Sequence, residues 1–174
     1  MEILIVGLIV VALMVYASTR IKRNAAQAFD QEVVELEHFM LKKPEGFLHQ
    51  INGGDPAFAF QAYSKDFGKD EAENVRQALI NMRIHPERTF EAVCDEVKST
   101  GTSLIERKGL DVSGYRAWSI ESEEEKEGRE TVIHSLIVDA PGRIFLLQST
   151  VLKEHNNDFL RRIDEMEDSL EIKK

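Results

Sequence analysis

The chain has 174 residues, of which 31 are acidic and 22 are basic, so its formal net charge is -9. This length has room for one membrane segment and one domain with its own core. The acidic excess argues against nucleic acid as a partner, because phosphate binding needs a surplus of Lys and Arg on one face. The single cysteine, Cys94, excludes an internal disulfide.

The chain starts with an apolar segment that carries no charge between Ile3 and Ala17. As a helix this segment is about 22 Å long, which is shorter than the ~30 Å hydrocarbon core of a bilayer. Residues 1–19 together reach roughly 28 Å, and the guanidinium of Arg20 can extend to the headgroups. We therefore expect a transmembrane helix over residues 1–19.

The charges around this segment predict its orientation. Glu2 stands before it, whereas Arg20, Lys22 and Arg23 follow it. A secretory signal has the opposite charge order and a small-x-small cleavage site, for which residues 15–17 are a poor match. The positive-inside rule then predicts a single-pass protein of the cell membrane, with the N-terminus outside and the soluble domain in the cytoplasm. A cleaved signal peptide is the alternative.

Residues 20–31 are expected to form a helical stalk, because the Ala-rich stretch at 25–28 favours helix and contains no helix breaker. The basic residues Arg20, Lys22 and Arg23 are candidates for contact with anionic lipid headgroups, worth about 3 kcal/mol together. Inside the membrane, Gly7 and Ala12 are small enough to let a partner helix approach closely. They are therefore the candidate partner contacts of the membrane segment.

The soluble domain, residues 32–174, begins with two predicted strands. Apolar and polar residues alternate from 33 to 39, which predicts one strand that ends at the turn over residues 43–46. A second turn is expected over residues 52–56. The sequence "AFAFQAY" at 57–63 then predicts a strand with Phe58, Phe60 and Ala62 on one face.

Two helices are expected next. Asp70 and Glu73 have the spacing of a capping box, and a helix from there has the apolar stripe Ala72, Val75, Leu79 and Met82. A second helix is expected to start at Pro86, to bury Phe90, Val93, Cys94 and Val97, and to end near residues 99–101.

The second half of the chain predicts a meander of antiparallel strands over residues 103–110, 115–121, 131–139 and 143–152, with "APGR" at 140–143 as its clearest hairpin. Asn156 or Asn157 can cap a last helix with the apolar residues Phe159, Ile163, Met166 and Leu170, before a short terminal strand. The expected class is α+β, an antiparallel sheet with helices packed on it, preceded by one transmembrane helix.

The segments "FMLKKPEGF" (39–47), "VSGYRAW" (112–118), "GRIFLLQSTV" (142–151) and "FLRRIDEMEDSLEI" (159–172), with the Phe58 and Phe60 strand, resemble the PsbP-like, Mog-type α/β/α sandwich. This resemblance covers roughly residues 37–172. It implies a non-catalytic docking domain, as in photosystem accessory proteins, a nuclear-import factor and bacterial envelope proteins. The shared positions are turn and core positions, so no functional residue is carried over.

No catalytic or metal site is expected from the residues. The five histidines, at 38, 49, 85, 134 and 155, have no metal-ligand spacing, and Cys94 falls on the buried stripe of its helix. The sequence "KSTGTS" (98–103) lacks the spacing of a phosphate-binding loop, and "SEEEKEGRE" (122–130) lacks that of a calcium loop. We therefore expect no enzyme activity and no cofactor.

Two hypotheses follow for function. The first is an accessory or stabilising subunit of a larger membrane complex, which the resemblance implies to be energy-transducing or photosynthetic; Tyr115 and Trp118 are its candidate partner contacts if they lie outside the core. The alternative is a membrane-tethered module that binds a small apolar ligand or lipid. Phe58, Phe60 and Tyr63 are the candidate lining of that pocket.

Overall fold

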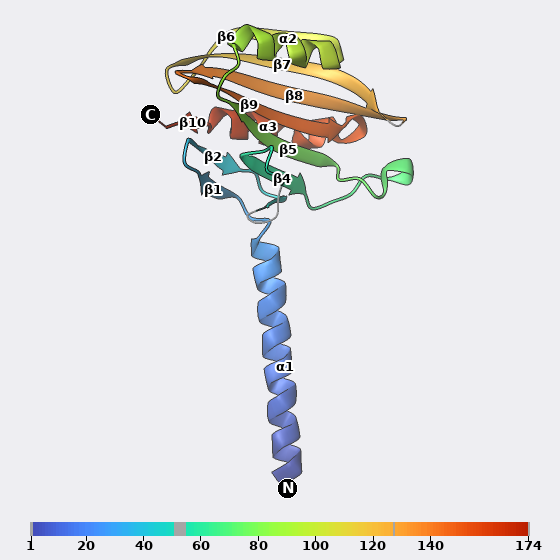
Figure 1. Ribbon diagram of the computed structural model, residues 1–174. Coiled ribbons are helices and arrows are strands. Elements are labelled where there is room, and N and C mark those ends of the chain that lie inside the picture. Colours follow the sequence, from blue (N-terminus) through green and yellow to red (C-terminus); the bar gives the residue numbers. More distant parts are fainter. Residues whose placement is uncertain (1, 51–54, 127, 174) are drawn as a thin grey trace.

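The computed structural model describes residues 2–50, 55–126 and 128–173, without the side chains of residues 2–10, 24–26, 71 and 126. Most of the turn expected over residues 52–56 therefore lies outside the described residues. The chain forms a long helix, α1 (Glu2–Gln27), and an α+β domain to which it is attached by one end (Figure 1). The expected class of the domain is confirmed.

The domain contains two antiparallel sheets. A three-stranded sheet has the order β1-β2-β10, and a seven-stranded sheet has the order β3-β4-β5-β9-β8-β7-β6. The strands are β1 (Glu32–Glu35), β2 (Phe39–Lys43), β3 (Phe47–His49), β4 (Phe60–Ser64), β5 (Ala78–His85), β6 (Thr102–Val112), β7 (Tyr115–Lys126), β8 (Arg129–Ala140), β9 (Arg143–Leu152) and β10 (Glu171–Ile172). The predicted meander β6 to β9 and its hairpin at 140–143 are confirmed.

Helices cover both faces of the large sheet, α2 (Phe90–Thr100) on one and α3 (Asn156–Asp168) on the other (Figure 1). The larger core lies on the α3 side and centres on Phe145, which is fully buried and meets the ring of Phe39 edge-on at 6.2 Å. The smaller core lies under α2, where Phe90, Val93, Cys94 and Val97 are buried as expected. The domain thus has a hydrophobic core on each side of its sheet.

The helix predicted from Asp70 to Met82 is wrong. Only Asp70–Ala72 forms a turn of 3-10 helix, and the chain then enters β5. The side chains of Ala78, Ile80 and Met82 alternate into the core, which is the two-residue period of a strand. Because β5 is hydrogen-bonded to β4 on one side and to β9 on the other, pairing with distant strands decides its conformation.

The first strand prediction needs a related correction, because residues 33–43 form the hairpin β1–β2 and not one strand. The chain reverses at 36–38, where the N–H of Leu36 donates to the carbonyl oxygen of Phe39 at 2.9 Å. The sheet alternation resumes with Phe39, Leu41 and Lys43, all of which are buried. Lys43 is a charged residue at a core position and is taken up below.

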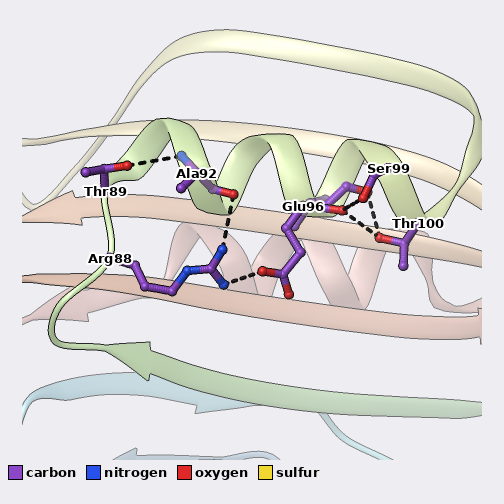
Figure 2. Close-up of polar contacts among 7 residues, drawn as sticks. Arg88, Thr89, Ala92, Glu96, Ser99 and Thr100 are labelled. Atoms are coloured by element: carbon purple, nitrogen blue, oxygen red, sulfur yellow. Dashed lines mark hydrogen bonds and ion pairs between the residues drawn. The ribbon is translucent and has the colours of Figure 1, made fainter.

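The ends of α2 are fixed by side chains (Figure 2). The hydroxyl of Thr89 accepts a hydrogen bond from the N–H of Ala92, so the helix starts after Thr89 and later than the expected Pro86. The guanidinium of Arg88 donates to the carbonyl of Ala92 and pairs with the carboxylate of Glu96. At the other end the hydroxyls of Ser99 and Thr100 donate to the carbonyl of Glu96.

The last helix buries Phe159, Ile163 and Met166 as expected, and Leu170 is buried just after it. Neither Asn caps this helix, since its N-cap position is His155. Asn156 is the first residue of α3, and its side-chain oxygen lies 2.9 Å from Nε2 of His134 on β8. A contact with the sheet therefore replaces the expected cap.

Candidate functional site: an exposed apolar helix and its junction with the domain

The helix α1 exposes apolar side chains all around its described surface. Val11, Leu13, Met14, Val15, Tyr16 and Ile21 are each 60–68% exposed. Among the side chains that the structure describes, no helical stretch is long and apolar enough to cross a membrane. A contiguous apolar surface of this kind is typical of a site for a membrane or a protein partner.

A buried lysine joins this helix to the domain. The ammonium of Lys43 donates to the carbonyl oxygens of Ala28 at 3.1 Å, Asp30 at 2.6 Å and Phe47 at 2.6 Å, and the side chain is fully buried. These three bonds use all three N–H groups of the ammonium. Burial lowers the pKa of Lys43, and the carboxylates of Glu32 and Asp30 act in the opposite direction.

Lys43 contacts the segment that directly follows α1. Ala28 follows directly after α1, where helix carbonyls lack partners inside the helix and favour a nearby cation. A further hydrogen bond, from the N–H of Gly46 to the carbonyl of Phe29 at 2.7 Å, ties the same segment to the turn after β2. We call residues 28–31 with Lys43 and Gly46 the junction. The junction anchors the segment that follows α1 to the domain.

Cations stacked on aromatic rings support the junction from the side of β4. The ammonium of Lys65 lies 5.9 Å from the ring centre of Phe29. The guanidinium of Arg76 lies 4.7 Å from the ring of Tyr63 and 3.9 Å from that of Phe67, and it donates to the carbonyl of Lys65 at 2.6 Å. Such contacts are each worth about 0.5–1 kcal/mol at exposed sites.

The expected lipid contacts lie on α1, below the junction. Arg20, Lys22 and Arg23 are exposed, and in the described part of the chain no carboxylate pairs with them. Their charges are therefore accessible to an external anion. Ala12 is exposed on the same helix, whereas Gly7 belongs to the residues whose side chains are not described.

The predicted pocket residues do not come together. Phe60 is buried in the core, where its ring centre lies 4.8 Å from that of His49. Tyr63 points to the opposite face of β4, because successive residues of a strand alternate. Phe58 precedes the strand, and the guanidinium of Arg83 lies 4.6 Å from its ring centre. A single apolar pocket lined by all three is not present in this arrangement.

The two predicted partner residues lie on opposite faces of β7. Trp118 is half-buried in the smaller core, with its ring edge-on to Phe90 at 5.4 Å. The ammonium groups of Lys98 and Lys108 lie 4.9 and 4.6 Å from its ring centre. Tyr115 packs at the border of the larger core. Trp118 is therefore mainly a core residue, and Tyr115 belongs to a different surface.

The described residues carry little that favours catalysis. The Cys94 thiol is buried, and burial raises its pKa to about 11, so it is protonated at neutral pH. No cluster of three His, Cys, Asp or Glu side chains among the described residues can hold a metal. Glu121, His134 and Ser149 are paired across β7, β8 and β9, an alignment that only strand register reveals. His134 and Ser149 are buried, which indicates a polar patch of the core.

Lys43 is the functional candidate that sequence reasoning missed. The signal was present, because Lys43 follows Phe39 and Leu41 at two-residue steps and therefore shares their buried face. A lysine at such a position needs internal acceptors. The acceptors were hidden because they belong to backbone carbonyls, which a sequence does not mark.

Neither a family model nor a curated protein matches the chain. Solved structures do. LpqN of Mycobacterium tuberculosis, involved in cell envelope biogenesis, has a TM-score of 0.60 at 13% identity over 83% of this chain and 91% of its own. The Ran-binding protein Mog1p of Saccharomyces cerevisiae has a TM-score of 0.56 at 11% identity over 83% and 96%. Cyanobacterial PsbP from Synechocystis has 0.50 at 11% identity over 83% and 94%. The domain therefore has the PsbP-like, Mog-type fold that its motifs indicated.

Proposed function

We propose that the chain is a membrane-tethered, non-catalytic binding domain that serves as an accessory or stabilising subunit of a larger membrane complex. Residues 1–19 lie in the bilayer, the N-terminus is outside, and residues 32–174 are in the cytoplasm. The observation that carries this proposal is the exposed apolar surface of α1 from Val11 to Ile21, which no part of the described domain covers. The sequence before it, "ILIVGLIV" at 3–10, is apolar as well.

The charges and the junction fit such a tether. Arg20, Lys22 and Arg23 follow the apolar segment at the level expected for anionic headgroups. The junction ties the segment after α1 to the domain through Lys43. This short, tied connection keeps the domain close to the bilayer, which suits a subunit that contacts neighbouring membrane proteins. Gly7 and Ala12 supply the close approach to a neighbouring helix.

The binding role is supported by the fold neighbours, one of which is a Ran-binding protein. An energy-transducing or photosynthetic complex rests on fold analogy with PsbP alone. Extraction in mild detergent, followed by identification of the proteins that remain bound to the chain, will show which complex it belongs to.

Two measurements in a bacterial host test the tether. After an alkaline carbonate wash, the full chain should stay in the membrane pellet, whereas a variant with Val11→Lys, Leu13→Lys and Val15→Lys should be released. A reporter fused after Lys174 should report the cytoplasm. Release of the unchanged chain by the wash, or a translocated reporter, would reject the proposal.

A further inference from the structure

A groove of about 550 Å³ lies at one end of the domain. The β1–β2 turn, the β8–β9 turn and the residues of β10 form its walls, and Tyr115 at the start of β7 lines it. We call it the Tyr115 groove. In Figure 1 the strand β10 lies farther from α1 than β1 and β2 do.

The groove is assembled from segments that are far apart in the sequence. The N–H of Lys173 donates to the carbonyl of His38 at 3.0 Å, which holds the end of β10 against the β1–β2 turn. The N–H of Ile172 donates to the hydroxyl of Ser113 in the β6–β7 turn at 3.0 Å. The ammonium of Lys173 pairs with Glu35 at 2.7 Å. The walls are thus fixed by contacts within the fold.

The lining combines apolar and basic residues. Tyr115, Ala140 and Ile172 supply apolar surface, while His38, Arg143 and Lys173 supply basic groups. Two of these basic groups already face carboxylates of the domain, since Lys173 pairs with Glu35 at 2.7 Å and the imidazole of His38 lies 3.8 Å from the carboxylate of Glu37. Arg143 is therefore the basic group of the lining that is left for a ligand.

Arg143 is the residue that points to a ligand. It is half-buried, and in the described part of the chain its guanidinium has no carboxylate partner. Nearby Arg116 pairs with both Asp139 at 2.7 Å and Glu91 at 3.1 Å. The guanidinium of Arg143 is therefore available to an anionic group of another molecule, whereas that of Arg116 is already paired.

We propose that the Tyr115 groove binds an acidic peptide segment of a partner protein, in which a carboxylate stands beside an apolar side chain. The carboxylate pairs with the guanidinium of Arg143, which can form two parallel hydrogen bonds to it. The apolar side chain packs on Tyr115 and Ile172. The net charge of -9 of the whole chain disfavours binding of such a peptide at other sites. This inference rests on the proposed function and names the partner chemistry.

A labelled peptide tests the groove. The full chain in nanodiscs of neutral lipid is titrated with a fluorescent ten-residue peptide of alternating Glu and Leu, and anisotropy is recorded. A peptide with Gln in place of Glu is the control for charge. We expect the Glu peptide to bind and the Gln peptide to bind at least tenfold more weakly, because it lacks the carboxylates that Arg143 pairs with.

Protein variants then locate the binding. Arg143→Ala should weaken binding of the Glu peptide about tenfold, whereas Arg161→Ala, which removes an exposed charge on α3, should leave it unchanged. Equal binding of both peptides, or equal affinity of the two variants, would overturn the proposal. Anionic lipid vesicles that displace the peptide from the unchanged chain would also overturn the proposal if Arg143→Ala abolished their binding. That outcome would assign the groove to lipid headgroups.

Membrane retention keeps this test separate from that of the proposed function. The Arg143→Ala chain should remain in the pellet after a carbonate wash, because Arg143 lies far from α1. If the unchanged chain stays in the membrane pellet but does not bind the peptide, only the proposal for the groove is refuted. If the wash releases the unchanged chain from the membrane, the proposed tether itself is refuted.

Discussion

The helix α1 and the sheet domain differ in how their apolar residues are covered. In the domain, Phe145 and its neighbours are buried between the large sheet and α3, whereas on α1 side chains such as Met14 are 68% exposed. The domain therefore carries its own stabilising core, whereas no part of the described domain covers the apolar side chains of α1. Between them, the junction around Lys43 belongs to both regions.

The largest contrast is expected from removing an aromatic ring in each region. Phe145→Ala leaves a cavity in the larger core and should lower the free energy of unfolding by about 3–5 kcal/mol. Tyr16→Ala, on the 64% exposed side chain in α1, should leave the unfolding of the domain unchanged. Urea unfolding of the full chain in detergent measures both. Equal losses would show that α1 packs into the domain.

The second contrast is a pH dependence that belongs to the domain alone. Burial, with Asp164 and Asp168 nearby, raises the pKa of Glu167 to about 7, while Arg107 acts in the opposite direction. The folded state then binds more protons than the unfolded state between pH 4.5 and 7, so stability falls as pH rises through this range. Glu167→Gln should remove this fall, which amounts to up to about 3 kcal/mol.

Unfolding followed at several pH values checks the prediction for Glu167. The unchanged chain and Glu167→Gln should differ most in slope between pH 5 and 7. Parallel curves for the two chains over this range would mean that Glu167 is ionised in the folded state.

The junction should show an intermediate effect. Lys43→Met keeps the length of the side chain but leaves one buried and two half-buried carbonyl acceptors without their donor, which costs about 1–3 kcal/mol. Amide exchange should become faster in residues 28–31. Lys42→Met, next to it on the exposed face of β2, is the matched control. Identical amide exchange in both variants would show that Lys43 does not stabilise residues 28–31.

The smallest effect is expected from shortening α1 itself. A chain that lacks residues 1–23 keeps Ala28, Phe29 and Asp30, so its domain should unfold within about 0.5 kcal/mol of the full chain. A chain that lacks residues 1–31 loses these carbonyls and should be less stable by an amount close to that of Lys43→Met. If both truncations behave alike, the helix and the domain are independent and the junction contributes nothing.

The sequence predicted best the elements whose pattern is local. The meander from β6 to β9 alternates and is punctuated by turns, and α2 and α3 have apolar stripes of helical period. The strand β5 was predicted as a helix, because its alternation is short and its two partner strands are distant in sequence.

Of the candidate site, only the exposed helix α1 was predicted. Its apolar segment and the basic residues after it can be read directly from the sequence. The junction could not be predicted, because the acceptors of Lys43 are carbonyls that become neighbours only when β2 and β3 bring them together. Tyr115 was predicted as a partner contact, but the groove around it was not, since four separate segments build it.

The depth of α1 in a bilayer tests the central claim most directly. A nitroxide label is placed at Met14→Cys or, as the control beyond the basic residues, at Gln27→Cys, in a chain whose buried Cys94 is replaced by Ala. Collisions with oxygen and with a water-soluble nickel complex are then compared in liposomes. We predict that the label at position 14 is reached by oxygen and shielded from nickel, and that position 27 shows the reverse. Free access of nickel to position 14 would contradict the account.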